Sequence, residues 1–319
     1  MSATQPFAFV PTGPGELPAA TLDRADRLRT DDAALDALWA DARVLLLDAE
    51  GRALVDEHGL PAAPRGVELS GGAGGSGMAT FLGLAADGQA WFSLDAELAA
   101  YTAPGTLDVR SAAAAWPMQE AAAFAQARAM QHWHQRHRHC GACGAHNRVE
   151  RGGWLRRCGG CGIEHYPRTD PAVIVAVSDG ERLLLGRQAG WPAGRYSVIA
   201  GFVEPGESLE QAVAREVEEE TGLAIARCHY RASQPWPFPG TLMLGFFADA
   251  IAGEPRPSDE LEDVRWFDVD SIADARRREQ AGDDSKAALR LSPSLSISRW
   301  LLEQWLLEQW LAERMAAAS

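Results

Sequence analysis

The segment GFVEPGESLEQAVAREVEEETGL, residues 201–223, carries the most specific pattern in this chain. Its seven fixed positions follow the spacing G-x5-E-x7-R-E-U-x-E-E-x-G-U, in which Val217 and Leu223 fill the apolar U positions. At background frequencies of roughly 5–10% per residue type, such a match arises by chance about once in 10⁸ windows. The fixed residues are Gly201, Glu207, Arg215, Glu216, Glu219, Glu220 and Gly222.

The pattern predicts one helix inside this segment. Ser208 can cap its N-terminus, so the helix begins near Leu209. Gly222 can end it in the left-handed conformation that glycine tolerates. Ala212 and Val213 supply part of an apolar stripe that would hold the helix against a sheet.

Three glutamates share one face of this helix, because residues three and four apart are neighbours on a helix surface. They are Glu216, Glu219 and Glu220, whereas Glu218 points to the opposite side. Carboxylates crowded in this way repel one another unless cations lie between them. Such oxygen ligands suit Mg²⁺ or Mn²⁺, which can bridge to phosphate oxygens, activate a water molecule and neutralise charge in a transition state.

A solvated acidic surface is the usual explanation for a glutamate-rich helix. It does not explain the loop from Gly201 to Glu207, in which five residues separate the two, or the Arg215–Glu216 pair. Glu207 and Arg215 are suited to an ion pair that orients the loop and the acidic face. We therefore favour a metal site on this helix.

These spacings resemble the Nudix box, the signature of the Nudix hydrolase family. The resemblance implies an α/β protein with the Nudix α/β/α sandwich, and hydrolysis of a nucleoside diphosphate linked to another group. Strand-like runs on both sides of the box fit this fold, and we expect the Nudix domain at 168–290. The runs are 172–187, 195–203, 223–233, 241–251 and 264–267, with a further helix from about Asp268.

Length and composition limit the remaining possibilities. A chain of 319 residues is long enough for two domains, and a net charge of −14 argues against a surface that binds nucleic acid throughout. No apolar run approaches the roughly 20 residues that span a bilayer. Residues 1–20 lack a basic segment followed by an apolar core, so we expect no secretory signal and a cytoplasmic protein.

Residues 1–131 predict a separate N-terminal α/β domain. The segments 44–55 and 79–95 each contain two strand-like runs joined by a turn, and a stretch rich in helix formers follows Pro117. No residue pattern in this domain indicates chemistry. A structural or dimerisation role is the simplest interpretation.

Four cysteines predict a zinc ribbon at 132–167. Two C-x2-C pairs, separated by fourteen residues, are the ligand pattern of a four-cysteine site: Cys140, Cys143, Cys158 and Cys161. Four thiolates leave no open position, so we expect one structural Zn²⁺ per chain. A pair of redox disulfides is the weaker alternative in a cytoplasmic chain.

Histidines and arginines surround this ribbon. We interpret the histidines as a solvated polar helix face rather than as ligands. The arginines could steer phosphate groups or could balance the anionic thiolates, and we favour the second interpretation. The residues are His132, His134, His137, His139 and His146, with Arg136, Arg138, Arg148, Arg151, Arg156, Arg157 and Arg168.

The C-terminal segment 291–319 predicts a helix that contains the repeat LLEQW-LLEQW. A five-residue period does not match the helical period, so its leucines and tryptophans spread around the helix. Such a helix must be buried against a domain or a partner subunit. Together with the resemblance to the Nudix family, this helix suggests a homodimer.

The segment SQPWPFPGT, residues 233–241, narrows the substrate. Three prolines interleaved with Trp236 and Phe238 predict a rigid loop that presents flat aromatic surface, which suits a planar base. A loop that packs its own aromatic rings is an equal alternative on residues alone. The segment resembles the S-Q-P-W-P-F-P-x-S signature of the NADH pyrophosphatase, or NAD-capped RNA hydrolase, branch of the family, with Thr241 in place of the last serine.

The resemblance implies a set of site residues. The catalytic and metal-binding set is Glu216, Glu219, Glu220 and Glu260, with the carbonyl group of Ala200. The substrate-binding set is Gln234, Pro235, Trp236, Pro237, Phe238, Pro239, Gly240, Thr241, Tyr166, Phe202, Arg110 and Ser298. At Gly153 the chain lacks an acidic contact that some members carry.

The implied reaction is metal-dependent hydrolysis of NADH or NAD⁺ to AMP and NMNH or NMN, with removal of NAD caps from RNA 5′ ends as a second activity. Glu219, Glu220 and Glu260 remain equal candidates for the general base. Two alternatives stay open. One is a Nudix hydrolase of ADP-ribose or dinucleoside polyphosphates, and the other is a non-catalytic nucleotide sensor.

Overall fold

The computed structural model describes residues 13–14, 22–70, 77–283 and 289–318. Contacts divide the chain into two compact units, of which the first contains Pro18–Thr169 with Trp236–Gly240 and the second contains Asp170–Pro235 with Thr241–Ser319. Nearly all of residues 1–20, where no secretory signal is predicted, lie outside the described residues. Among the described helices, none combines the length and the apolar character needed to cross a membrane.

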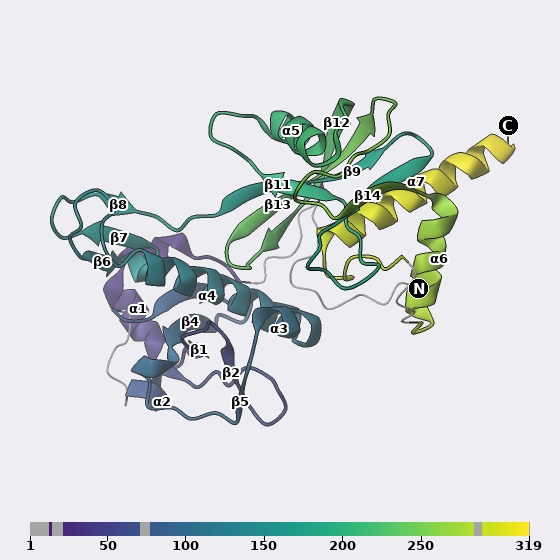
Figure 1. Ribbon diagram of the computed structural model, residues 1–319. Helices are drawn as coiled ribbons and strands as arrows, with labels where there is room; N and C mark the ends of the chain where they lie inside the picture. Colours follow the sequence, from purple (N-terminus) through teal and green to yellow (C-terminus); the bar gives the residue numbers. More distant parts are fainter. Residues whose placement is uncertain (1–12, 15–21, 71–76, 284–288, 319) are drawn as a thin grey trace. The chain divides into compact units, whose positions relative to one another are not determined.

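The first unit is built on a five-stranded sheet with the order β3-β4-β1-β2-β5 (Figure 1). Two antiparallel pairs, β1–β2 and β3–β4, correspond to the two predicted hairpins, and parallel pairing of β1 with β4 joins them. The strands are β1 (Arg43–Leu47), β2 (Ala53–Val55), β3 (Thr80–Leu84), β4 (Ala90–Asp95) and β5 (Gly105–Leu107).

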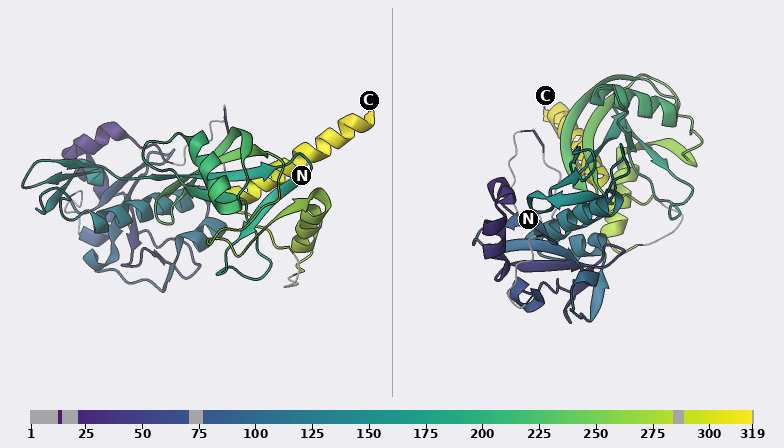
Figure 2. Two further views of the ribbon diagram at one scale, coloured as in Figure 1. Left: turned by 45° about the horizontal axis from the view of Figure 1, so that its top comes forward. Right: turned by 90° about the vertical axis from the view of Figure 1, so that its left-hand side faces the viewer.

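Helix α4 covers this sheet and contacts β1, β3 and β4 (Figure 2). It begins directly after Pro117, because a helix start does not need the N–H group that proline lacks. Phe124, Met130 and Trp133 are buried side chains on α4. The helical segments of this unit are η1 (Asp26–Thr30), α1 (Asp32–Trp39), α2 (Gly66–Ser70), η2 (Ala96–Leu98), α3 (Val109–Ala115), α4 (Met118–Arg136) and η3 (Arg151–Gly153).

The ribbon is part of the same unit. Its strands β6 (Asn147–Glu150), β7 (Leu155–Cys158) and β8 (Glu164–His165) form an antiparallel sheet in that order. Trp154 ties it to the larger sheet, since its indole N–H donates to the Phe81 carbonyl at 2.7 Å and its ring lies 3.7 Å from the Arg29 guanidinium. The ribbon therefore packs on the N-terminal domain.

The second unit contains the predicted α/β/α sandwich. Its sheet has the order β12-β13-β9-β10-β14, and β11 pairs with β9. The pairs β10–β14, β10–β9 and β11–β9 are antiparallel, whereas β13 pairs with β9 in parallel. The strands are β9 (Asp170–Ser178), β10 (Arg182–Arg187), β11 (Ile199–Phe202), β12 (Ile225–Trp236), β13 (Thr241–Ala250) and β14 (Asp263–Asp268).

Alternation along β9 separates the two faces of this sheet, because successive strand residues point to opposite sides. Val173, Val175 and Val177 pack in the core under α5 (Leu209–Thr221). Ile174 and Ala176 pack on the opposite face, in a cluster with residues of α6 (Val269–Gln280) and α7 (Ile297–Ala318). Figure 1 shows α5 on one side of the sheet and α7 on the other.

Helix α7 is buried only in its first half. Ile297, Leu301 and Trp305 are in the core of the second unit, so this half has the burial that the sequence requires. The C-terminal part of the helix extends past the sheet, as the left view of Figure 2 shows. Apolar side chains that remain exposed there are Leu307, Trp310, Leu311 and Met315.

The predicted loop 233–241 is shorter than expected. Strand β12 continues to Trp236 and β13 begins at Thr241, so only residues 237–240 form the turn. Pro235 is tolerated within β12 because this strand lies at the edge of the sheet, where a missing N–H need not cost a ladder hydrogen bond.

Candidate functional site

Helix α5 has the ends that the sequence predicts. Ser208 caps its N-terminus by accepting a hydrogen bond from the Gln211 backbone, and the Gln211 side chain accepts one from the Ser208 N–H at 2.8 Å. Gly222 ends the helix with φ 69°. Since the apolar residues Ala212, Val213 and Val217 hold the helix on the sheet, its orientation about its own axis is set.

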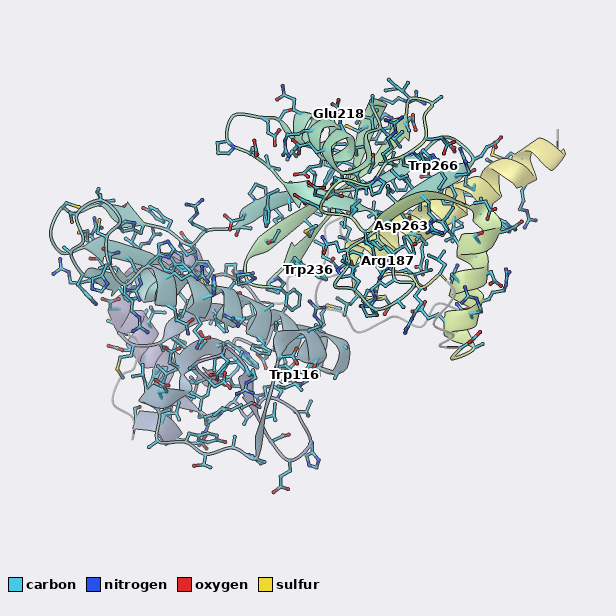
Figure 3. The ribbon with its side chains drawn as sticks, in the orientation of Figure 1. Trp116, Arg187, Glu218, Trp236, Asp263 and Trp266 are labelled. Carbon is cyan, nitrogen blue, oxygen red and sulfur yellow. The ribbon has the colours of Figure 1, made fainter. Side chains whose placement is uncertain are left out.

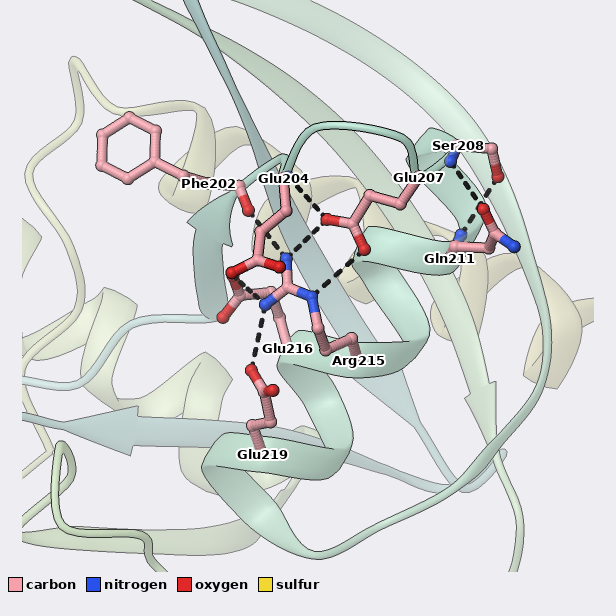
Figure 4. Close-up of polar contacts among 8 residues, drawn as sticks. All are labelled: Phe202, Glu204, Glu207, Ser208, Gln211, Arg215, Glu216 and Glu219. Carbon is pink, nitrogen blue, oxygen red and sulfur yellow. Dashed lines mark hydrogen bonds and ion pairs between the residues drawn. The ribbon is translucent and has the colours of Figure 1, made fainter.

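Arg215 organises the acidic face of α5 (Figure 4). Its guanidinium donates to the Glu207 carboxylate at 2.6 and 3.1 Å, and to the Phe202 carbonyl at 2.9 Å. The same group donates to Glu216 at 2.9 Å and Glu219 at 3.0 Å. These bonds favour the ionised carboxyl, and the pKa of Glu207 is accordingly lowered. The Arg215 guanidinium thus connects the loop at Glu207 and the end of β11 to the carboxylates of Glu216 and Glu219.

Gly201 provides space for the Glu216 carboxylate. A Cβ at this position would lie about 2 Å from the carboxylate atoms, at 1.9 Å from Cδ. Burial is the main cause that raises the pKa of Glu216. The first glycine of the pattern is therefore required for the close approach of β11 to α5.

We expect Gly201→Ala to displace the Glu216 carboxylate, because no real Cβ is tolerated that close to other atoms. A displaced ligand would weaken Mn²⁺ binding by about 10–100-fold, as for other disturbances of ligand orientation. Isothermal titration with Mn²⁺ measures this loss. Gly190→Ala is the matched control, since an added Cβ there meets open space. Equal affinities of the two variants would contradict the expectation.

Glu220 is a buried carboxyl with an exposed fraction of 6%. Within the described residues, no hydrogen bond or ion pair reaches its carboxylate. Burial raises its pKa to about 7, and the charges of Glu216, Glu260 and Glu219 act in the same direction. A buried carboxylate without a partner is costly, so this position favours a bound cation.

We expect the metal-free protein to lose stability between pH 5 and 8. The folded state binds a proton on Glu220 with a pKa of about 7 instead of the usual 4.5, so rising pH favours unfolding across this window. The difference corresponds to on the order of 3 kcal/mol, which Glu220→Gln removes. Urea unfolding at both pH values, without divalent ions, measures it. Glu218→Gln, which changes an exposed glutamate, is the control and should keep the pH dependence of the wild type. If the unfolding free energies of wild type and Glu220→Gln depended on pH in the same way, the inferred burial cost would be wrong.

Glu260 reaches this cluster through backbone contacts of its own loop. Residues Arg256 and Ser258 donate backbone hydrogen bonds to the carbonyl groups of Thr221 and Glu220, at 2.8 and 3.1 Å. These bonds tie the loop to the C-terminal end of α5. Glu260 follows in an exposed turn, close enough for its charge to raise the pKa of Glu220.

The donor chemistry of this face fits a hard divalent cation, since all its side-chain ligands would be carboxylate oxygens. The glutamates are not drawn together as tightly as the cysteines: among the described residues, only the four cysteines gather three or more ligand atoms within 4.8 Å. Mutual repulsion and the bonds of Glu216 and Glu219 to Arg215 account for this spacing.

The four-cysteine zinc ribbon is confirmed. The sulfur atoms of Cys140 and Cys161 lie 3.7 Å apart, and those of Cys143 and Cys158 lie 3.3 Å apart. Four thiolates at about 2.3 Å from a tetrahedral Zn²⁺ are separated by about 3.8 Å, so the residues fit the ion. Backbone N–H groups of Cys161 and Gly160 lower the pKa of the Cys158 thiol to about 6, which favours the ligating thiolate.

The aromatic hairpin tip lies beside a cation. The rings of Trp236 and Phe238 are 4.9 Å apart in an edge-to-face arrangement. Arg110, in the first turn of α3, places its guanidinium 4.8 Å from the Phe238 ring and 5.9 Å from the Trp236 ring. Arg110, Trp236 and Phe238, three residues of the predicted substrate set, therefore lie close together. Figure 3 labels Trp236 at the tip.

Other members of the predicted substrate set have different surroundings. Gln234 is fully buried and holds the start of α7, donating to the Leu295 carbonyl and accepting from the Ile297 N–H. Ser298 is buried beside the hydroxyl groups of Ser197 and Ser292. The exposed aromatic residues are Tyr166, which donates to Glu164, and Phe202, which follows Ala200 and Gly201 at the end of β11. Pro235, Pro237, Pro239, Gly240 and Thr241 lie in or next to the hairpin turn.

The predicted solvated histidine face is wrong for His134. This ring lies against Thr80 and Arg156, and the Arg156 Nε donates to its Nδ1 at 2.9 Å. Burial, followed by the Arg156 charge, lowers the pKa of His134 to about 3. Sequence periodicity along α4 could not reveal this contact, because the partner arrives from the ribbon strand β7.

Comparison with known proteins supports the family resemblance. The NUDIX domain profile matches residues 168–289, and the NADH pyrophosphatase zinc ribbon profile matches residues 135–166. The chain is similar to a Mycobacterium bovis protein named NAD-capped RNA hydrolase NudC, with 38% identity over 291 residues, 88% of this chain and 91% of that protein.

Two further relatives match over shorter regions. A Stutzerimonas stutzeri protein, also named NAD-capped RNA hydrolase NudC, is 50% identical over 142 residues, which cover 44% of this chain and 51% of that relative. A Macaca fascicularis protein named NAD-capped RNA hydrolase NUDT12 is 39% identical over 196 residues, 58% of this chain and 41% of the relative. The alignments thus span about half or less of these two proteins.

Proposed function

Because the chain belongs to the Nudix hydrolase family, in its NADH pyrophosphatase branch, we propose that it hydrolyses the pyrophosphate of NADH or NAD⁺ to AMP and NMNH or NMN. We also propose that it removes NAD caps from RNA 5′ ends, as the names of its relatives suggest. The observation that carries the reaction is the buried Glu220 carboxylate, which has no partner among the residues that the structure describes, on a face organised by Arg215.

We assign Mg²⁺ or Mn²⁺ to the glutamate face. The ligands would come from Glu216, Glu219, Glu220, Glu260 and the carbonyl group of Ala200. When bound, such an ion neutralises diphosphate charge and acidifies a water molecule. Arg215 would hold Glu216 and Glu219 in place, and one of Glu219, Glu220 and Glu260 would accept the proton of the attacking water.

We assign the planar ring of the nucleotide to the hairpin tip. Trp236 and Phe238 offer aromatic faces, and Arg110 adds a cation suited to a phosphate or to ring stacking. Tyr166 and Phe202 are exposed aromatic residues that remain candidates for further contacts. Gln234 and Ser298 would act by positioning β12 and α7, since their side chains are engaged in the core.

We propose a cytoplasmic homodimer. Exposed Leu307, Trp310, Leu311 and Met315 on the second half of α7 support a partner subunit. A four-thiolate zinc site supports a reducing compartment, since its ligands must stay unoxidised. Light scattering after size exclusion would measure the mass, and a monomer at micromolar concentration would refute the dimer.

Product analysis tests the function. Purified zinc-loaded protein is incubated with NADH, NAD⁺, ADP-ribose, a dinucleoside polyphosphate and NAD-capped RNA, with Mg²⁺, with Mn²⁺ or with neither. We expect metal-dependent AMP and NMNH from NADH, identified by mass. Faster turnover of ADP-ribose or the polyphosphate would assign a different Nudix substrate, and no turnover of any compound would favour a nucleotide sensor.

A salt series separates the two proposed substrates. If ribbon arginines contact RNA, activity on capped RNA should fall with salt more steeply than activity on free NADH. Equal slopes would argue against a ribbon contact.

A further inference from the structure

A cavity of about 210 Å³ lies in the first unit, and its lining includes none of the residues assigned to hydrolysis or nucleotide binding above. Its lining comes from β3, β4, α4 and the ribbon strands β6 and β7, so the N-terminal domain and the ribbon build it together. One buried water occupies only about 10–15 Å³ by a comparable measure. The cavity therefore has room for a small organic molecule.

Arg156 is a buried cation in the lining, with an exposed fraction of 8%. Its Nε donates to His134 Nδ1 at 2.9 Å and one terminal nitrogen donates to the Asn147 carbonyl at 3.3 Å. Arginine only donates, so His134 must be the neutral tautomer with its proton on Nε2. Both hydrogen-bond partners of Arg156 are thus uncharged, and within the described chain no carboxylate forms an ion pair with it.

This arrangement is unusual, because a buried charge is costly unless an opposite charge compensates it. The neighbouring Arg157 shows the contrast: it forms ion pairs with Glu150 at 2.9 Å and Glu164 at 2.7 Å. The second terminal nitrogen of Arg156 has no hydrogen-bond partner among the described residues. A donor with a full charge is therefore available at the cavity.

Gln131 supplies a second unsatisfied group in the lining, with an exposed fraction of 7%. Its amide nitrogen donates to the Asp48 carbonyl at 2.9 Å and to Asp95 Oδ1 at 2.8 Å. Because both partners are acceptors, the amide cannot be turned around, and its oxygen is the atom left without a partner. The Asp95 carboxylate also lines the cavity, and this bond occupies its Oδ1 atom.

The rim of the cavity is apolar. Met78, Leu98 and Val149 line it and are all exposed large hydrophobic residues. Small-molecule sites commonly combine such an apolar rim with a few convergent polar groups. The polar interior and the apolar rim together match a ligand with an anionic head and an apolar or planar body.

We propose that this cavity is a second binding site, for a small organic anion of the carboxylate or phosphate monoester class. The anionic group pairs with Arg156, and its body rests on the rim. The site is independent of the glutamate face and of the proposed hydrolysis.

Calorimetric titration with phenyl phosphate, benzoate and benzyl alcohol tests the site, in the absence of divalent ions. The three probes share an aromatic body and differ in the head group. We expect one binding event per chain for at least one anion, and which anion binds distinguishes a phosphate from a carboxylate ligand. Absence of binding by both anions, or equal binding of benzyl alcohol, would overturn the proposal.

Matched variants locate the event. Arg156→Gln is expected to weaken anion binding at least tenfold, whereas Arg157→Gln removes the same charge one residue away and should leave it unchanged. An equal loss in both variants would indicate general electrostatics and would refute the site. Binding at the glutamate face would survive Arg156→Gln.

A second pair of variants avoids the core, in case Arg156→Gln does not fold. Leu98 is 55% exposed on the rim, so charges are tolerated there. Leu98→Glu should repel the anion and weaken binding several-fold, and Leu98→Lys should retain or strengthen it. Equal affinities of these two variants would contradict an anion site at this cavity.

Discussion

Glu220→Gln is expected to lower the turnover of NADH by at least 10²–10³-fold while the fold is retained, and Glu219→Gln to cause a loss of similar size. Glu220 is a buried carboxyl group, and none of the described residues forms a hydrogen bond or ion pair with its carboxylate. Removing this charge takes away a proposed metal ligand but leaves the apolar contacts of α5 intact. Steady-state kinetics with saturating Mg²⁺ or Mn²⁺ measures the loss.

Glu218→Gln is the matched control for this pair. Glu218 lies on the same helix, between Val217 and Glu219, but it is exposed on the face turned away from the sheet (Figure 3). Its variant should keep near wild-type turnover. Near wild-type rates in Glu219→Gln and Glu220→Gln would contradict the proposed mechanism. A large loss in Glu218→Gln would show that turnover depends on the total negative charge of α5 rather than on these two positions.

Cys158→Ser is expected to abolish zinc binding and to unfold the ribbon. Its three strands are short, and structural Zn²⁺ contributes about 10–16 kcal/mol in comparable small domains. Because Trp154 and Arg156 of the ribbon contact Phe81 and His134, the loss should also destabilise the rest of the first unit. Zinc content by mass spectrometry and thermal unfolding measure both effects.

Cys228→Ser controls for the loss of a thiol. Cys228 lies half-buried on β12 in the second unit, and burial raises the pKa of its thiol. This variant should keep its zinc and unfold like the wild type. A Cys158→Ser protein that still binds one zinc ion per chain would contradict the four-cysteine site.

The spacing of residues within short segments was sufficient to predict much of the candidate site. The cap at Ser208, the end at Gly222 and the shared face of the three glutamates follow from helix geometry. The Glu207–Arg215 pair was predicted in the same way, from chemistry within one short segment. The two C-x2-C pairs likewise predicted the four-cysteine zinc site. The assigned roles in substrate binding remain proposals.

Other features depended on residues far apart in the sequence. Pro235 suggested a loop, but the position of β12 at the sheet edge lets the strand continue. The histidine pattern of α4 suggested a solvated face, but β7 brings Arg156 against His134. Gln234 contacts the segment before α7, and Ser298 contacts a serine of that segment. No local sequence pattern predicts these contacts.

The sequence by itself determined the family, the zinc ligands and the acidic helix face, because each rests on residue types at short, regular spacing. Only the tertiary structure decided which charged groups are buried and which have partners. Glu220 and Arg156 illustrate this, since both are buried and neither forms an ion pair with another described residue. The cost of a buried charge depends on its surroundings in three dimensions, and composition or periodicity does not contain that information.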